Sequence, residues 1–211
     1  MSKPIVFIHG SGDSARVWGA QLDQFDAHPT YAIDLPGHGE RPDTLPAQVS
    51  VLDYAHAVHE ISEDELHLAQ PIIAGHSLGG AVALMMALAY SAELGGLILI
   101  GTGARLRVHP DLLASARAEP RPALYRDLAA CNDFDIMGQM PDIHLPTLII
   151  CGADDRMTPV KYSQYLHTRI AGSELRVIAQ AGHYVMREQP EAVKQAIQEW
   201  LARDGVPAPS L

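Results

Sequence analysis

Basic residues are scarce in this sequence, and those present are scattered. Lys and Arg together number 15, against 25 Asp and Glu, so the formal net charge is −10. Binding to a phosphate backbone requires clustered Lys and Arg side chains. This charge balance therefore argues against a nucleic-acid partner.

Cysteine is also rare, which excludes a disulfide-stapled fold. The two cysteines are Cys131 and Cys151. Cys151 ends an apolar run over residues 147–151, where a free thiol packs as a small hydrophobic group. We expect both cysteines to be reduced and structural, as in a reducing compartment.

Long hydrophobic runs are absent as well. The apolar segments are too short or too rich in glycine to span a bilayer. Residues 1–4 lead directly into a strand-like run, without the pattern of a signal peptide. We therefore expect a cytoplasmic protein with no membrane partner.

The sequence contains six short apolar runs that show no alternation of polar and apolar residues. They alternate with helix-like stretches, which is typical of a parallel sheet covered by helices on both faces. For 211 residues, of which 47% are hydrophobic and 19% charged, this predicts one α/β domain over residues 1–211. Its open, mostly parallel sheet should have about six strands. The runs cover residues 5–8, 31–33, 72–74, 97–100, 148–151 and 175–178.

The intervening stretches predict helices over residues 15–25, 51–62, 78–90, 159–171 and 190–203. One segment breaks the alternation. Residues 102–146 contain several prolines between short helical pieces, so we interpret them as a small lid inserted after the fourth strand. Loops at the carboxyl edge of a parallel sheet build its binding sites, and this segment should cover that edge.

Ser77 lies in the segment that best predicts chemistry. Residues 75–79 match the pattern G-x-S-x-G, directly after a predicted strand and directly before a predicted helix. Such a turn holds the serine in a strained conformation with its hydroxyl projecting outward. Gly75 and Gly79 remove the side chains that would collide across it. Ser77 is therefore the predicted nucleophile.

Two backbone amides are expected to stabilise the oxyanion that forms when Ser77 attacks a carbonyl group. One is the amide of Leu78, at the amino end of the helix. The other should come from the loop after the first strand, where small residues allow a close approach. We favour the Ser11 amide over that of Gly12, and we expect His9 to orient the loop.

A serine hydroxyl needs an adjacent base, and His183 is the best placed of the 11 histidines. It follows the last predicted strand and precedes the final helix, at the same sheet edge as Ser77. His76 adjoins the serine, but neighbouring side chains on a tight turn point apart, so we interpret it as a packing residue. The orienting carboxylate should follow the fifth strand, where Asp154 and Asp155 are both available.

Taken together, these segments resemble those of the α/β-hydrolase superfamily, in its serine esterase and lipase branch. The order nucleophile, acid and base is that of the family. The acid turn of the family, G-x-x-D-x-x-x-P, matches residues 152–159, and this resemblance selects Asp155. The other matching segments are the oxyanion loop at residues 9–12, the D-x-P-G-H-G turn at residues 34–39, and the base loop containing His183, Glu188 and Pro190.

The sequence departs from the family in two respects. The family usually has two further strands before the oxyanion loop, whereas here that loop begins at residue 9. The usual lid is also longer than residues 102–146. The resemblance thus implies a compact sheet, with residues 31–33 at its edge, under a short lid.

The resemblance implies a carboxylesterase-like serine hydrolase with the triad Ser77, Asp155 and His183 and an acyl-enzyme intermediate. The predicted substrate is a small-molecule ester or thioester, and no metal or organic cofactor is expected. The alternatives are a C–C hydrolase or lyase on the same scaffold, or a ligand receptor that retains the triad. Four side chains are predicted to line a hydrophobic substrate pocket, namely Trp18, Met157, Tyr184 and Val185.

Overall fold

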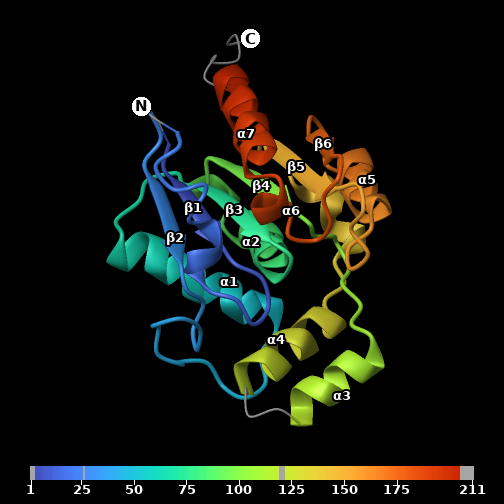
Figure 1. The fold of residues 1–211 in the computed structure, drawn as a ribbon. Helices are drawn as coiled ribbons and strands as arrows, with labels where there is room; N and C mark the ends of the chain where they lie inside the picture. The colour runs from blue at the N-terminus through green and yellow to red at the C-terminus, as the bar shows by residue number, and fades with distance from the viewer. Residues whose placement is uncertain (1–2, 26, 119–121, 205–211) are drawn as a thin grey trace.

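The fold is an open sheet with helices on both faces, seen in a computed structural model (Figure 1). The structure describes residues 3–25, 27–118 and 122–204. The sheet has six strands, all parallel, in the order β2-β1-β3-β4-β5-β6. The strands are β1 (Ile5–Ile8), β2 (Thr30–Ile33), β3 (Ile72–His76), β4 (Gly96–Ile100), β5 (Thr147–Gly152) and β6 (Glu174–Ile178).

The predicted strands are confirmed to within two residues at each end, and β2 lies at the edge of the sheet as expected. The central strands are buried along their whole length, which explains their unbroken apolar sequence. Their register aligns the carboxyl ends: Ile8 of β1 pairs with Gly75 of β3, and Gly75 pairs with Leu99 of β4. Residues that follow these strands are therefore brought together at one edge.

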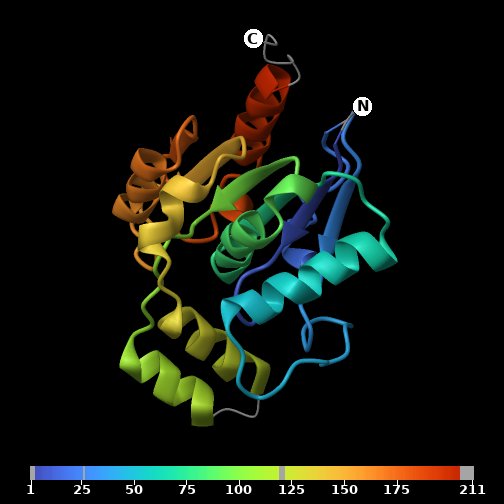
Figure 2. The ribbon, with the colours of Figure 1, turned by 180° about the vertical axis from the view of Figure 1, so that it is seen from behind.

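Two apolar layers sandwich the sheet. Val6 and Ile8 point to the layer formed with three helices, α1 (Val51–Glu60), α2 (Leu78–Ala89) and α5 (Val160–Arg169). Ile5 and Phe7 point to the opposite layer, formed with a 3₁₀ turn (Ala15–Trp18), α6 (Val185–Glu188) and α7 (Pro190–Asp204). Because successive side chains of a strand point to opposite faces of the sheet, β1 contributes residues to both apolar layers. Figure 1 shows α6 and α7 in front of the sheet, and Figure 2 shows α1 and α2 on the other side.

The predicted helix over residues 15–25 is wrong. Only Ala15–Trp18 is helical, as a single 3₁₀ turn. Gly19 follows it directly and weakens helix propagation. The Trp18 and Phe25 rings instead pack on Phe7, at centroid distances of 4.9 Å and 6.4 Å, so tertiary packing decides the path of this segment.

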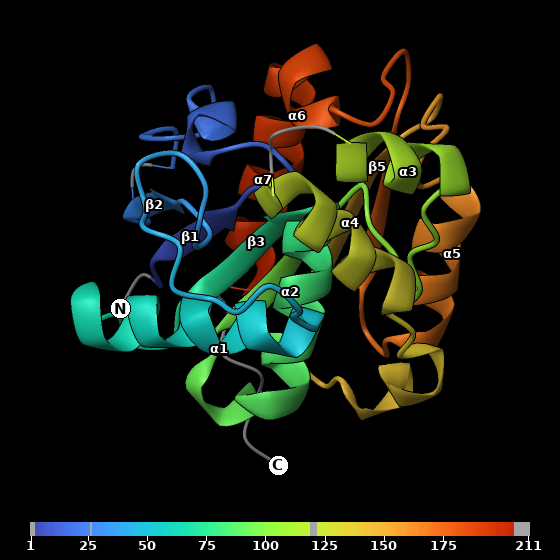
Figure 3. The ribbon, with the colours of Figure 1, turned by 90° about the horizontal axis from the view of Figure 1, so that it is seen from below.

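The segment between β4 and β5 carries two helices, α3 (Pro110–Ala118) and α4 (Pro122–Asp133), followed by a 3₁₀ turn (Met137–Asp142). Both helices lie beyond the carboxyl ends of the strands, as Figure 3 shows from that side. Both cysteines are buried free thiols. None of the helices in the described ranges is long and apolar enough to cross a membrane.

Candidate active site

Ser77 occupies the turn between β3 and α2 in a conformation that non-glycine residues rarely adopt. Its backbone angles are φ 53° and ψ −114°. The Ser77 amide donates to the carbonyl of Ile100 at 3.0 Å, and the Thr102 hydroxyl donates to the Ser77 carbonyl at 2.8 Å. Strain of this kind persists only where the surrounding structure fixes it. Neighbouring β4 and its loop provide these fixed contacts.

The glycines on either side of Ser77 allow the close packing of the turn. A Cβ atom on Gly75 would lie 2.0 Å from the Gly79 carbonyl oxygen, and one on Gly79 would lie 2.3 Å from the Ile8 carbonyl oxygen. Since both contacts are with backbone, no side-chain movement could relieve them. The G-x-S-x-G pattern is thus a steric requirement of this turn.

The loop after β1 lies close beside Ser77. A Cβ on Gly10 would lie 3.2 Å from the Ser77 Cβ. The Gly12 amide already donates to Asp127 Oδ2 at 2.9 Å, which favours the Ser11 amide as the free donor. Leu78 is the first residue of α2, so its amide is among those that no helical carbonyl accepts.

His9 contacts this loop from the end of β1. Its Nε2 accepts a hydrogen bond from the Leu35 amide at 3.0 Å, so the ring proton lies on Nδ1, which donates to the Gly10 carbonyl at 2.8 Å. Burial lowers the pKa of His9 and keeps the ring neutral. These contacts agree with an orienting role for His9.

Asp155 and His183 form a buried pair at the same sheet edge. His183 Nδ1 lies 2.9 Å from Asp155 Oδ2, which also accepts from the Thr158 hydroxyl at 2.8 Å. Burial alone would raise the pKa of Asp155, but the hydrogen bonds with His183 and Thr158 outweigh it and hold that pKa below its usual value. Since an ionised carboxylate only accepts, His183 carries its proton on Nδ1 and leaves Nε2 unprotonated. The neighbouring Asp154 is exposed.

The loop that carries His183 is held by a carboxylate from α6. Glu188 accepts from the Gly182 amide at 2.7 Å and from the Tyr184 amide at 3.0 Å. The two donors flank His183, so this contact fixes the backbone on both sides of the ring.

His76 packs against His183. It is fully buried, and its Nε2 donates to the His183 carbonyl at 2.9 Å. Burial, reinforced by the neighbouring His183, lowers the pKa of His76 to about 3, so the ring is neutral. His76 also belongs to the lining of the cavity described below, and its buried Nδ1 has no hydrogen-bond partner among the described residues.

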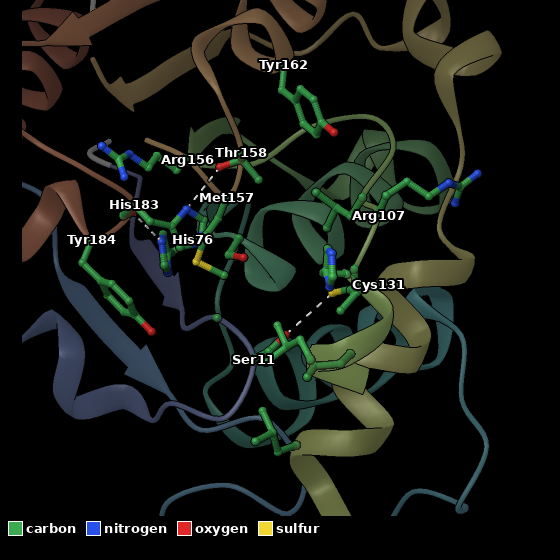
Figure 4. A pocket seen from close by; sticks show the side chains of 18 residues that line it. Ser11, His76, Arg107, Cys131, Arg156, Met157, Thr158, Tyr162, His183 and Tyr184 are labelled. Atoms are coloured by element: carbon green, nitrogen blue, oxygen red, sulfur yellow. Dashed lines mark hydrogen bonds between the residues drawn. The ribbon is translucent and has the colours of Figure 1, made fainter. Parts of the chain in front are cut away.

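A cavity of about 410 Å³ opens beside Ser77 and His183. Met157 and Tyr184 line it (Figure 4), but Trp18 and Val185 do not. Trp18 and Val185 are fully buried in the apolar layer on the α7 side of the sheet, so their assignment to the pocket was wrong. The sequence predicts that a residue lies near the carboxyl edge of the sheet, but it does not reveal whether its side chain points into the cavity or into an apolar layer.

Eight of the 18 residues that line the cavity come from a segment whose individual residues were not predicted. This segment is the region between β4 and β5, and it contributes Arg107 and His109 besides six apolar side chains. Tyr162 of α5 also lines the cavity. The apolar contributors from that region are Leu106, Val108, Leu112, Leu124, Leu128 and Cys131. The prolines of this region predicted its location over the site, but no sequence signal identified its inward-facing side chains.

Within the described ranges, one group of side chains has the spacing of possible metal ligands. It consists of His59, Glu63 and Glu93, on the α1 side and outside the cavity lining. His59 Nε2 lies 2.6 Å from Glu93 Oε2, so these two side chains already contact each other directly. It does not contribute to the site around Ser77.

Comparison with known proteins identifies the family of this fold. The sequence pattern described as the alpha/beta hydrolase family matches residues 5–196. The chain belongs to this family. A pimeloyl-[acyl-carrier protein] methyl ester esterase of Neisseria meningitidis is 28% identical to it, over 90% of this chain and 89% of the relative.

Solved structures of hydrolases superpose on most of the chain. A thermophilic esterase matches with a TM-score of 0.85 and 32% identity, covering 98% of this chain and 92% of its own. A hydrolase from Pseudomonas aeruginosa matches with a TM-score of 0.82 and 26% identity, covering 94% and 90%. The expected fold and enzyme class are confirmed: the chain is a carboxylesterase-like α/β hydrolase.

Proposed function

We propose that this hydrolase cleaves small-molecule carboxylic esters or thioesters with Ser77 as nucleophile, His183 as base and Asp155 as orienting acid. One observation carries the proposal. The strained Ser77 and the Asp155-paired His183 line the same cavity, with the loop of Ser11 beside them. A nucleophile, an oriented base and oxyanion donors are the parts that acyl transfer requires.

In the first half-reaction His183 Nε2 removes the proton from Ser77 Oγ, which attacks the carbonyl carbon. The amides of Ser11 and Leu78 hold the resulting oxyanion. The imidazolium then gives its proton to the departing alkoxide or thiolate, as the bond between that group and the acyl carbon breaks. Asp155 stays ionised and stabilises the imidazolium.

In the second half-reaction water replaces the alcohol. His183 removes one proton from the water, whose oxygen attacks the acyl carbon. The bond from that carbon to Ser77 Oγ breaks, and His183 returns its proton to the serine. The products are a carboxylic acid and the regenerated enzyme.

The cavity supports an apolar acyl or alcohol group of moderate size. Its volume of about 410 Å³ is within the range of ligand sites, and its exposed surface is mainly apolar, with Arg107 and Arg156 also in the lining. We propose that α3 and α4 act as the lid of a single domain. A chain-length series of p-nitrophenyl esters should show an optimum where the acyl chain fills this cavity.

The test is the substitution Ser77→Ala, with Ser91→Ala as matched control. Ser91 is exposed at the far end of α2. Ser77→Ala is expected to lower ester hydrolysis by at least about 10⁴-fold, and Ser91→Ala to leave it unchanged. An alkyl phosphonate should label Ser77 covalently in the parent.

Ester hydrolysis at the parental rate by Ser77→Ala would refute the assignment. Faster cleavage of 1,3-diketones than of any ester would instead favour a C–C hydrolase. A parent that binds esters without turnover, and that the phosphonate leaves unlabelled, would indicate a receptor.

A further inference from the structure

Asp127 is a fully buried carboxylate in α4 with no part in the reaction described above. Its Oδ1 accepts from the Tyr54 hydroxyl at 2.5 Å, and its Oδ2 accepts from His38 Nε2 at 2.8 Å and from the Gly12 amide at 2.9 Å. Buried carboxylates are rare unless they are paired and hydrogen-bonded. Three donors from three distant segments therefore converge on this group.

His38 neutralises Asp127. Its second ring nitrogen, Nδ1, lies 3.2 Å from the Pro36 carbonyl oxygen, so both nitrogens face acceptors and both carry protons. Burial lowers the pKa of His38, but the hydrogen bond and charge of Asp127 outweigh that effect and raise it. Asp127 and His38 thus form an ion pair inside the protein.

The neighbouring Arg126 fixes the other donors of this network. Its Nε donates to the Tyr54 hydroxyl at 3.1 Å, and its Nη2 donates to the Pro36 carbonyl at 3.0 Å. Its Nη1 donates to Asp43 at 2.7 Å. Tyr54 and the turn that contains His38 are therefore each bound by both Arg126 and Asp127 of α4.

One face of α4 packs against the loop that carries Ser11 and Gly12. Leu124, Asp127 and Cys131 are three and four residues apart, which places them on the same side of the helix. A Cβ on Gly12 would lie 2.8 Å from Leu124 Cδ1, and the Ser11 hydroxyl is 3.7 Å from Cys131 Sγ, as the dashed line in Figure 4 marks. Leu124 and Cys131 also line the cavity. The same helix thus shapes the pocket and supports the loop.

We infer that Asp127 is a positioning residue for the oxyanion site: by binding the Gly12 amide, it holds the adjacent Ser11 amide in place beside Ser77. This inference rests on the proposed function. Gly12 has a φ of +67°, a conformation that the Asp127 contact helps to fix. Because a displacement of about 1 Å in a catalytic site can cost about 100-fold in rate, loosening this loop should slow the reaction.

The experiment compares Asp127→Ala and Asp127→Asn with the parent on a p-nitrophenyl ester and on the matching thionoester. Sulfur is a weak hydrogen-bond acceptor, so a thionoester gains less from the oxyanion donors. For Asp127→Ala we expect kcat on the oxygen ester to fall by about 10- to 100-fold with KM nearly constant. The rate ratio of oxygen ester to thionoester should fall by about tenfold. Asp127→Asn keeps one carbonyl oxygen near Gly12 and should show a smaller fall of the same kind.

Thr147→Val is the control for the loss of a buried hydrogen bond. The Thr147 hydroxyl donates to the Leu145 carbonyl at 2.8 Å, at the amino end of β5 and away from the cavity. Its kcat and ester ratio should equal those of the parent. If Asp127→Ala does not fold, Asp127→Asn decides the question.

A parental ester-to-thionoester ratio in the folded Asp127 variants would overturn the inference. It would leave the proposed function intact, provided that Ser77→Ala is inactive. Full activity of Ser77→Ala would overturn both.

Discussion

The protein contains two buried Asp–His pairs that look alike by distance. Asp155 and His183 are 2.9 Å apart, and Asp127 and His38 are 2.8 Å apart. Both carboxylates have fully buried side chains, and the imidazoles are 8% and 4% exposed. Each carboxylate also accepts from a hydroxyl, Thr158 in the first pair and Tyr54 in the second.

The pairs differ at the second ring nitrogen. His183 Nε2 takes no hydrogen bond from any described residue, and His183 lines the cavity with Ser77. His38 Nδ1 instead faces the Pro36 carbonyl, so that ring has no lone pair to offer. A buried carboxylate therefore marks an oriented histidine, but only a free nitrogen at a cavity marks a base.

The largest expected effect separates the two histidines. His183→Gln should lower kcat/KM for p-nitrophenyl esters by about 10⁴-fold or more, because it removes the base. His38→Gln should lower it by less than about tenfold, since glutamine can still donate to Asp127. Steady-state kinetics on both purified variants measures the contrast.

Circular dichroism spectra of both variants provide the control for folding. Equal losses of kcat/KM in two folded variants would break the comparison, because they would mean that His38 acts as directly as His183.

A smaller effect should distinguish the hydroxyl partners of the two carboxylates. Thr158→Val removes one donor to Asp155 but keeps the Thr158 amide contact at 2.9 Å. A hydrogen bond to a charged group is worth about 1.5–3 kcal/mol, so we expect kcat to fall by about 10- to 100-fold. Tyr54→Phe removes one donor to Asp127 and should lower the free energy of unfolding by about 1–3 kcal/mol.

Urea titrations and ester kinetics on both variants test this pairing. Thr158→Val with parental kcat, or Tyr54→Phe with parental stability, would show that the corresponding carboxylate does not depend on its hydroxyl.

Sequence reasoning predicted the positions of candidate residues where these residues follow a strand closely. Ser77, Asp155 and His183 each lie just after a strand end, and parallel register brings these ends together. The residues alone left Asp154 and Asp155 open; the family's acid turn selected Asp155, which is the one that contacts His183.

The Asp127 network was not predictable in this way. Asp127 lies 115 residues from Gly12, 89 from His38 and 73 from Tyr54 along the chain. It sits in an otherwise ordinary helix, and no motif connects its partners. The wrong prediction for Trp18 and Val185 has another cause: the sequence pattern does not say which of the two apolar layers receives a buried side chain.

The smallest expected effect concerns stability at alkaline pH. The raised pKa of His38 means that the folded state holds its proton more tightly than the unfolded chain does. Its contribution is therefore fully present below about pH 6.5 and is lost as pH rises through the raised value. We expect the free energy of unfolding to decline above pH 7.

His9 and His76 have lowered pKa values, so their contributions have the opposite sign and are already complete above about pH 6.5. The decline above pH 7 should thus disappear in His38→Gln and persist in His109→Gln, whose side chain is 75% exposed. Urea titrations between about pH 6.5 and 7.8 measure it, below the range in which Cys131 and Cys151, whose pKa values burial raises in the folded protein, would add a decline of their own. A decline that survives in His38→Gln would mean that the ion pair with Asp127 is not its source, and that the two Asp–His pairs differ less than their hydrogen bonds indicate.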